Sequence, residues 1–247
     1  MKLDPNKNPV YVIVFTALVS GAFTAGIMAL HVATEPIVQA NERLLTEKAI
    51  VSVFALGDPS RMTARQINET IRTRVAGLPD PDRKDDPLAQ PIEIGSGDKK
   101  MRLLVAYKEP VPAGTKPDLK DKDKVLAYAF PLHGVGFWAM ISGWLAVTPD
   151  GGKTVGVVFT DHQETPGLGG RITESEFREQ FRGRLVTPPP AGEKSIDVSR
   201  SGKGDRHVDA ITGATGTSNA VEKFINADLA RFRAAAAEAG LIEKGKE

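Results

Sequence analysis

A long apolar segment lies near the start of the sequence. The residues from Val10 to Ala33 include no Asp, Glu, Lys or Arg, and a helix of this length spans the hydrocarbon core of a bilayer. A cleaved signal peptide is the alternative, because Ser20, Gly21 and Ala22 resemble a small-residue cleavage site. However, the apolar run continues well beyond that point. The pattern therefore favours a retained, single-pass transmembrane helix over residues 10–33.

The charges around this segment predict its orientation. Lys2 and Lys7 precede the apolar run, whereas Glu35 and Glu42 follow it. Positive residues are retained on the cytoplasmic side of membrane helices. We therefore expect residues 1–9 to lie in the cytoplasm, and the C-terminal domain to lie on the periplasmic, extracytoplasmic side of the inner membrane.

The next part of the chain changes pattern twice. After Pro36, the stretch IVQANERLLTEKAIVSVFAL has apolar residues at helical spacing, which predicts that the helix continues outward. Residues 57–124 are rich in Pro, Asp and Lys, with short apolar pieces such as MRLLVAY, and this composition predicts loops and short strands. Residues 34–124 are therefore interpreted as a helical stalk followed by a loop-rich variable region.

The predicted core domain, residues 125–240, begins with two runs, VLAYAFPLHGVGFWAM and GWLAVTPDGGKTVGVVFTDH. Turn residues from Pro149 to Gly152 lie inside the second run and predict a β-hairpin. A glycine loop, QETPGLGGR (residues 163–171), follows, and then an amphipathic segment with Phe177 and Phe181 on one helical face. A polar loop over residues 187–207 comes next.

A final helix is predicted from about Asn219, where Glu222 three residues later would complete a capping box. Its apolar residues fall on one face, which predicts that this face is buried: Val221, Phe224, Ile225, Leu229 and Phe232. The predicted fold is α+β: one N-terminal transmembrane helix, then an extracytoplasmic domain with a twisted β-sheet and flanking helices, and a tail over residues 241–247.

Composition excludes several classes of chemistry. The chain has 32 basic and 31 acidic side chains, so it offers no general electrostatic attraction for nucleic acid. It has no cysteine, which excludes disulfides, thiolate metal sites and a cysteine nucleophile.

The stretch VDAITGATGTSNAV, residues 208–221, holds more hydroxyl groups than a turn or a helix cap needs. It places Thr212, Thr215, Thr217 and Ser218 just before an apolar helical run. The backbone N–H groups at a helix N-terminus stabilise an anion, so a phosphate beside Thr215 to Ser218 would be favoured there. A glycine-rich loop that only caps the helix is the alternative interpretation.

Three other candidate motifs for nucleotides or metals lack the residue spacing or the following structure that they require. Gly152-Lys153-Thr154 ends like a phosphate-binding loop, but Val147 stands where the first glycine is required. Residues 134–139 fit the dinucleotide pattern GxGxxA, yet a hairpin follows where that fold needs a long helix. His133 and His162, with Glu164 near the second, lack the paired spacing of a metal site, so no metal is expected.

Two stretches together resemble a known family. HGVGFWAMISGWLAVTPDGGKTVGVVFTDHQETPGLGGR and VDAITGATGTSNAV resemble the FMN-binding domain shared by the C subunit of sodium-translocating NADH:quinone reductase and the G subunit of the Rnf complex. The similarity covers about residues 133–232 and the N-terminal anchor. GFWAM and TSNAV are more similar to the quinone reductase subunit, whereas TEPIVQA and FREQFRGR are more similar to the Rnf subunit.

The resemblance implies that FMN is bound covalently, through a phosphoester to Thr215. It also implies that a flavin transferase moves FMN from FAD onto this hydroxyl and recognises the residues around it, Asp209, Thr212, Gly213 and Ala214. Gly216 departs from the bulkier residue that is often found after the acceptor threonine. By the same resemblance, the flavin pocket would be lined by two stretches: Gly136, Phe137 and Trp138, and Glu164, Thr165, Gly167, Leu168 and Gly169.

The implied function is electron relay within a membrane complex that moves ions. The chain would act with other membrane subunits and the lipid bilayer, and would not be an active enzyme alone. Two alternatives remain at this point. One is a flavinylated extracytoplasmic reductase outside either complex, and the other is a flavin-free, membrane-tethered binding or scaffold module.

Overall fold

The computed structural model describes residues 9–190 and 192–243, which divide into two compact units after Leu45. Helix α1 (Pro9–Val53) runs through the division, and Pro36 lies inside it without ending it. The predicted continuation of the helix beyond Pro36 is confirmed. From Val10 to Val38 its large apolar side chains are exposed, and the helix is long and apolar enough to cross a membrane. Exposed apolar side chains on all sides suit a lipid environment.

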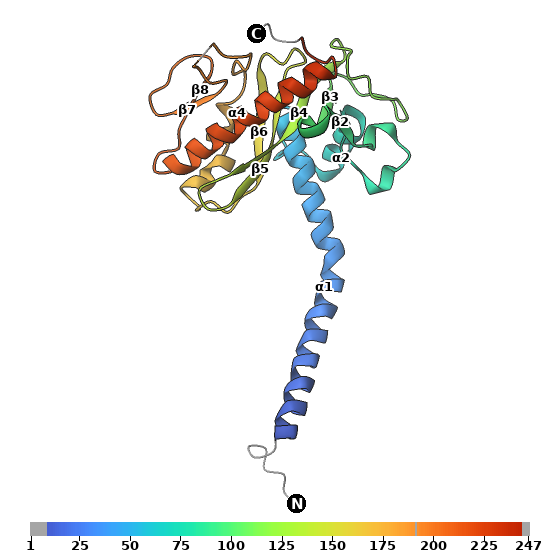
Figure 1. The fold of residues 1–247 in the computed structure, drawn as a ribbon. Helices are drawn as coiled ribbons and strands as arrows, with labels where there is room; N and C mark the ends of the chain where they lie inside the picture. The colour runs from blue at the N-terminus through green and yellow to red at the C-terminus, as the bar shows by residue number, and fades with distance from the viewer. Residues whose placement is uncertain (1–8, 191, 244–247) are drawn as a thin grey trace, which may run out of the picture. The chain divides into compact units, whose positions relative to one another are not determined.

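The second unit is built on an antiparallel sheet in the order β1-β3-β4-β5-β6, with β2 paired to β3 (Figure 1). The strands are β1 (Val75–Ala76), β2 (Ile92–Ile94), β3 (Met101–Tyr107), β4 (Val125–Val135), β5 (Met140–Val147) and β6 (Thr154–Asp161). A separate parallel pair consists of β7 (Asp197–Ser199) and β8 (His207–Asp209). The α-helices are α2 (Ala64–Arg74), α3 (Ser175–Glu179) and α4 (Thr215–Glu238), and short 3-10 helices cover Pro81–Arg83, Pro87–Ala89, Gly97–Lys99 and Gly169–Thr173.

Helix α4 lies across one face of the sheet (Figure 1). Alternate residues of the strands point toward it, and the ring of Phe130 on β4 stacks on Phe232 of α4 at 4.5 Å between centroids. Phe159 on β6 meets Phe224 edge to face at 6.5 Å. The predicted apolar face of this helix is confirmed, because all five of its residues are buried: Val221, Phe224, Ile225, Leu229 and Phe232.

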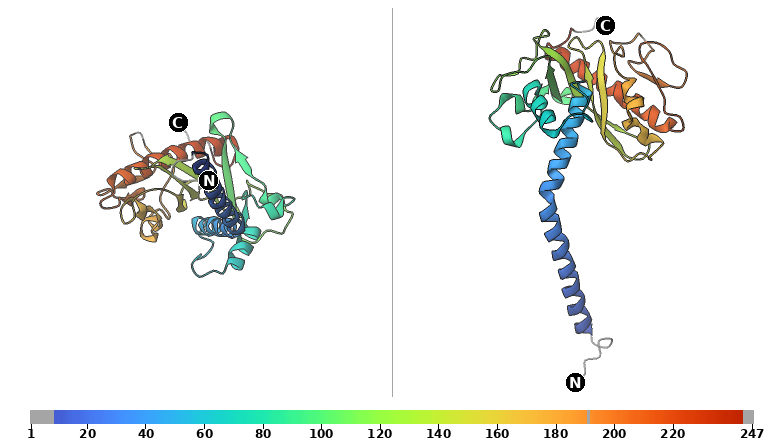
Figure 2. Two further views of the ribbon diagram at one scale, coloured as in Figure 1. Left: turned by 90° about the horizontal axis from the view of Figure 1, so that it is seen from below. Right: turned by 180° about the vertical axis from the view of Figure 1, so that it is seen from behind.

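The opposite face of the sheet is lined by small residues, including Ala127, Ala129 and Gly156, and residues 46–53 at the end of α1 cover it (Figure 2). A Cβ at position 156 would lie 2.7 Å from the carbonyl oxygen of Val53, so only glycine permits this approach. Both faces of the sheet are therefore buried, which gives the second unit two apolar layers.

One polar contact fixes the end of β4 against α4. The Asp228 carboxylate on the buried side of α4 accepts a hydrogen bond of 2.9 Å from the His133 backbone N–H. Burial raises the pKa of the Asp228 carboxyl, although this hydrogen bond and the nearby Arg231 favour its ionised form. The next residue, Gly134, faces the Phe224 ring so closely that a Cβ there would overlap it. The end of the β4–β5 hairpin is thereby held over the first half of α4.

The start of α4 differs from the prediction. The helix begins at Thr215, not near Asn219, and Ala214 is its N-cap residue without a side-chain cap hydrogen bond. The predicted capping box is wrong, because the Glu222 carboxylate is used elsewhere. It accepts hydrogen bonds from the Val198 N–H at 2.9 Å and from Lys194 Nζ at 2.6 Å. The Glu222 side chain, which the local pattern assigned to the helix cap, binds β7 instead.

Strands β4, β5 and β6 form two consecutive hairpins. The predicted turn from Pro149 to Gly152 is confirmed, because β5 and β6 pair antiparallel on either side of it. The GFWAM stretch lies between two strands, in a turn that the sequence did not predict. Residues 136–139 form the turn between β4 and β5, closed by the Gly136 N–H donating to the Ala139 carbonyl at 2.8 Å. We call these four residues the hairpin tip.

The amphipathic segment after the glycine loop is shorter than its pattern suggested. Helix α3 ends at Glu179, so Phe177 lies on it and Phe181 lies just beyond it. Both rings are nevertheless buried and meet edge to face at 5.3 Å between centroids. The shared burial was predicted correctly, whereas the single helical face was not.

Candidate functional site

Glu164 joins three segments that are far apart in the sequence. Its carboxylate, 5% exposed, accepts hydrogen bonds at Oε1 from the backbone N–H groups of Phe137 at 2.8 Å and Trp138 at 3.2 Å. Its Oε2 accepts a hydrogen bond of 2.6 Å from the hydroxyl of Thr217. The hairpin tip, the glycine loop and the start of α4 therefore meet at one buried anionic group.

Glycines make this meeting sterically possible. A Cβ at Gly136 would lie 2.5 Å from Glu164 Oε1, and a Cβ at Gly169 would lie 2.6 Å from Glu164 Oε2. At Gly216, a Cβ would overlap the ring of Phe137. The absence of a bulkier residue after Thr215 thus has a structural reason, because the Phe137 ring occupies that space.

The hydroxyl groups of the TGATGTS stretch divide into exposed and buried ones. Thr215 is the first residue of α4 and is exposed, and Thr212 is exposed in the turn before it. Thr217 and Ser218 are buried. The Ser218 hydroxyl donates to the Ala214 carbonyl at 3.0 Å and accepts from the Ile211 N–H at 3.0 Å. Ser218 therefore shapes the loop, whereas Thr215 lies at the surface of the domain.

The start of α4 also offers backbone donors. The first residues of an α-helix have N–H groups without a partner in the helix, and they carry partial positive charge. Here the first helical acceptor, the Ala214 carbonyl, is used by the Ser218 N–H at 3.0 Å. The N–H groups of Thr215, Gly216 and Thr217 therefore precede the regular hydrogen-bond ladder, which suits an anion beside Thr215.

An exposed apolar surface adjoins this helix start. Five large apolar side chains of the hairpin and the glycine loop are between 45% and 72% exposed: Val135, Phe137, Trp138, Met140 and Leu168. We call them the apolar patch. It reaches the start of α4, where the Phe137 ring lies against Gly216, and the turn before it, where the Leu168 side chain lies against Gly213. The Trp138 indole N–H donates to the Thr165 hydroxyl at 3.2 Å, which orients its ring.

Backbone conformation explains two further glycines. Gly167 has φ of +76° and Gly213 has φ of +82°, in the region that residues with a Cβ rarely adopt. Gly167 lies at the exposed end of the glycine loop, with nothing within 4 Å of a Cβ placed there. The three glycines at 167, 169 and 170 suggest close backbone approach to a ligand, which stays a prediction. Within the protein itself, Gly169 packs against Glu164 and Thr217.

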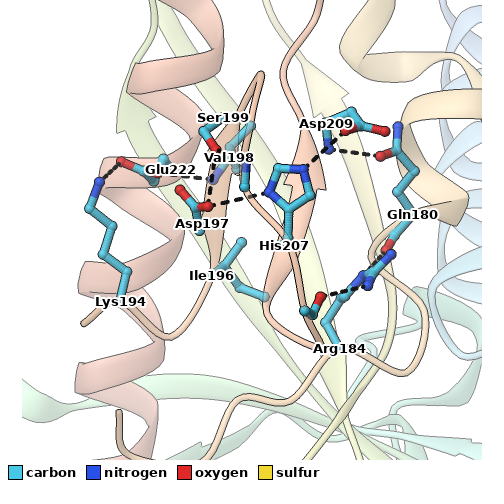
Figure 3. A network of polar contacts seen from close by, with 12 residues as sticks. Gln180, Arg184, Lys194, Ile196, Asp197, Val198, Ser199, His207, Asp209 and Glu222 are labelled. Carbon is cyan, nitrogen blue, oxygen red and sulfur yellow. Dashed lines mark hydrogen bonds and ion pairs between the residues drawn. The ribbon is translucent and has the colours of Figure 1, made fainter. Parts of the chain in front are cut away.

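Asp209 lies at the end of β8, outside the apolar patch. Its backbone N–H donates to Gln180 Oε1 at 2.8 Å, and its exposed carboxylate lies 3.0 Å from His207 Nε2 (Figure 3). After Asp209 the chain turns, with the Ala214 N–H donating to the Ile211 carbonyl at 3.0 Å. The structure thus places the predicted recognition residues Asp209, Thr212, Gly213 and Ala214 on one short segment leading to Thr215.

Sequence reasoning missed Arg200. Its Nη2 lies 3.3 Å from the Thr215 hydroxyl oxygen, within hydrogen-bond distance. It comes from the polar loop after β7, which carries no motif, so no local pattern could connect it with Thr215. The two histidines weighed as metal ligands are engaged within the sheet region: His162 Nδ1 accepts from the Glu164 N–H at 3.2 Å, and His133 Nδ1 lies 3.2 Å from the Ser142 hydroxyl.

Comparison with known proteins identifies the domain that carries this site. Residues 136–230 match the FMN-binding domain family. Over 107 residues the chain is 36% identical to the C subunit of the Na+-translocating NADH-quinone reductase of Vibrio alginolyticus. It is 26% identical over 231 residues to the same component of the Neisseria meningitidis serogroup A complex. Residues 136–230 are thus an FMN-binding domain by similarity, and the chain resembles these C subunits over most of its length.

The extent of these matches differs. The Vibrio alignment covers 42% of this chain and 41% of that relative, and the Neisseria alignment covers 89% and 88%. Among solved structures, NqrC of Shewanella oneidensis superposes with a TM-score of 0.58 at 19% identity, over 82% of this chain and 98% of that one. At this identity the superposition establishes the shared fold alone, which is the α+β fold with an antiparallel sheet that the sequence predicted.

The residues at the start of α4 fit a flavin mononucleotide. A phosphate needs hydrogen-bond donors and positive charge, which the first N–H groups of α4 and Arg200 supply beside Thr215. A planar aromatic ring system needs an apolar surface, which the apolar patch supplies on the adjoining side. The site therefore has separate polar and apolar parts, as this cofactor does.

Proposed function

We propose that this chain is a membrane-anchored electron-transfer subunit that carries FMN through a phosphoester to Thr215. The observation that carries the proposal is the position of Thr215. Its hydroxyl is exposed at the first residue of α4, inside the FMN-binding domain, between backbone donors and the apolar patch. The bound FMN would supply a carrier that accepts electrons singly or in pairs.

The protein residues would position this carrier and set its surroundings. The helix start and Arg200 would hold the phosphate, while Phe137, Trp138 and Leu168 would lie against the ring system and exclude water from one side of it. A covalent bond has a clear advantage in an open site of this kind. A tether keeps the cofactor at a high effective concentration even where its concentration in solution is low.

We infer that the surrounding assembly is a Na+-translocating NADH:quinone reductase. Support comes from the relatives named above, which are the C subunits of such complexes and favour this assembly over the Rnf complex. The other membrane subunits would be the electron partners, and a flavin transferase using FAD would load the cofactor. Residues 10–33 would anchor the chain in the inner membrane, residues 34–124 would form the stalk and variable region, and residues 125–240 would bind FMN.

The chain would relay electrons and would not act as an enzyme alone. The GxGxxA stretch lies at the end of β4 and in the hairpin tip, in an antiparallel hairpin that lacks the parallel strand and helix of a dinucleotide-binding unit. Electrons from NADH would therefore have to arrive through another subunit. The periplasmic placement rests on Lys2 and Lys7, which lie outside the described residues.

The attachment is tested by producing the full chain together with a flavin transferase. The wild-type chain should fluoresce on a denaturing gel, and mass spectrometry should locate the flavin on the peptide that contains Thr215. Thr215→Val should abolish the fluorescence, whereas Thr215→Ser should retain part of it because it keeps a hydroxyl.

The outcomes separate the alternatives. A flavin that persists in Thr215→Val and maps to Thr212 would move the acceptor to the other exposed hydroxyl of the segment. A wild-type chain that takes up no flavin at all would support the flavin-free scaffold. Rapid NADH oxidation by the purified, loaded chain would support an autonomous reductase instead of a relay.

A further inference from the structure

Arg200 is placed beside the acceptor hydroxyl without a competing partner. Other arginines of the domain, such as Arg171 and Arg231, pair with carboxylates three residues away. In the part of the chain that the structure describes, Arg200 forms no ion pair with a carboxylate, and its side chain contacts the Thr215 hydroxyl at 3.3 Å. It is also exposed. A guanidinium in this state keeps most of its donors for an added anion.

The loop that carries Arg200 is fixed to the same helix that carries Thr215. Just before it, the Val198 N–H donates to the carboxylate of Glu222 on α4 at 2.9 Å (Figure 3). Just after it, the Gly202 N–H donates to the Ser199 hydroxyl at 3.0 Å. These bonds hold the chain on both sides of Arg200. The backbone of Arg200 is therefore held close to α4, and its exposed side chain reaches the Thr215 hydroxyl from there.

A histidine connects β7 and β8, the two strands next to this loop. His207 on β8 lies between two carboxylates, with Nδ1 3.3 Å from Asp197 Oδ2 and Nε2 3.0 Å from Asp209 Oδ1 (Figure 3). The first carboxylate belongs to β7 and the second ends β8. Because β8 leads to Thr215 and β7 leads to Arg200, this contact ties together the two segments that supply the acceptor and the arginine.

We propose that Arg200 binds the phosphate that links FMN to Thr215 and promotes the transfer that forms the link. This inference rests on the function proposed above. A planar guanidinium donates paired hydrogen bonds to phosphate oxygens, and it remains charged at any physiological pH. It lies within hydrogen-bond distance of the oxygen that would become the ester oxygen, so it also lies beside the phosphate oxygens bonded to the same phosphorus.

The transfer step shows where this charge acts. Thr215 Oγ forms a bond to the phosphorus of the FMN half of FAD, the bond from that phosphorus to the bridging oxygen breaks, and AMP leaves with the bonding pair. The hydroxyl proton passes to the transferase or to water. Negative charge gathers on the phosphoryl oxygens during this displacement, and Arg200 is placed to stabilise it together with the N–H groups of the α4 start.

The test measures the rate at which the purified, flavin-free full chain is loaded by a flavin transferase with FAD. In-gel flavin fluorescence gives the time course for wild type, Arg200→Gln and Arg200→Lys. Arg200→Gln should slow loading by roughly tenfold or more, the size expected for one charge-assisted hydrogen bond, and Arg200→Lys should recover part of the rate. Lys203→Gln, which removes an exposed positive charge from the same loop, should load at the wild-type rate.

A second readout does not depend on any rate. After complete loading, the phosphorus NMR signal of the phosphodiester should shift between wild type and Arg200→Gln, and Lys203→Gln should leave it in place. Equal rates and equal phosphorus signals in wild type and Arg200→Gln would overturn the role of Arg200. If Arg200→Gln proves unfolded by circular dichroism, a wild-type rate and signal in folded Arg200→Lys would overturn the need for a planar, paired donor. Loading that does not depend on Thr215 would instead overturn the proposed function itself.

Discussion

Glu164 is a buried carboxylate whose acceptors are filled by main-chain and hydroxyl donors. Two N–H groups of the hairpin tip and the Thr217 hydroxyl all point at it. Hydrogen bonds to a charged group are stronger than neutral ones, and each donor left without a partner after burial carries a desolvation cost. The arrangement of the hairpin tip over the start of α4 therefore depends on this one side chain.

We predict that Glu164→Ala lowers the free energy of unfolding by about 3 kcal/mol, because buried donors lose their acceptor. Glu164→Gln should cost less, since its amide oxygen still accepts. Urea unfolding of the full chain in detergent, followed by tryptophan fluorescence, measures both values. Glu174→Ala is the matched control, because that glutamate is exposed and pairs with Arg171 at the surface. A cost for Glu164→Ala no larger than the control's would contradict the central role of Glu164.

The sequence could identify some residues of the site but not their roles. The resemblance pointed to Glu164 as part of a pocket lining, yet its partners lie 27 residues before it and 53 residues after it. Contacts over such separations are set by the packed fold. Arg200 was missed for the same reason, since the pairing of β7 with β8 and the contact of Val198 with Glu222 bring its loop to Thr215. Local patterns record turns, caps and periodicity, but not these contacts.

At the scale of elements, the sequence predicted a turn correctly where the turn residues themselves determine the structure. The turn from Pro149 to Gly152 was predicted because its residues favour a tight turn between strands. No turn was predicted at the hairpin tip, where Phe137 and Trp138 are residue types typical of strands. They stand in a turn here because the Glu164 carboxylate holds both of their N–H groups. The start of α4 was misplaced for a similar reason, since Glu222 serves β7 and not the helix cap.

The contact between the hairpin tip and α4 supports a prediction about Gly216. Gly216→Ala should lower stability by about 1–3 kcal/mol, because the new methyl group overlaps the Phe137 ring and the ring must move. In a Phe137→Ala background the same change should be neutral or stabilising, because alanine restricts the unfolded chain more than glycine does. Four urea unfolding curves complete this double-mutant cycle.

The cycle tests whether the effects of the two substitutions on the free energy of unfolding add. Residues that share a contact show non-additive effects, whereas distant residues add. Additive costs for Gly216→Ala and Phe137→Ala would mean that the ring does not occupy the space over Gly216. The apolar patch would then have no fixed attachment to the start of α4 at that point, and Leu168 over Gly213 would be its remaining contact with this segment.

At the scale of the whole molecule, the chain combines an apolar helix with a water-exposed domain. The large apolar side chains of α1 from Val10 to Val38 are exposed, whereas the second unit buries its apolar residues on both faces of its sheet. The uncharged run over residues 10–33 was recognisable from the sequence because it differs in composition from the rest of the chain, whereas the division after Leu45 was not predicted. The side of the membrane that the domain occupies depends on the flanking charges and is a separate prediction.

The absence of cysteine allows a direct test of that side. A single cysteine can be placed at Asp98, which is exposed in the second unit, or at Asn6, before the apolar run. If Lys2 and Lys7 keep the N-terminus in the cytoplasm, a membrane-impermeant maleimide should label Asp98→Cys in spheroplasts with an intact inner membrane. Asn6→Cys should be labelled only after that membrane is permeabilised, and the unaltered chain should never be labelled. The reverse pattern would place Thr215 in the cytoplasm, where free flavin is available, and would remove the advantage of a covalent tether outside the cell.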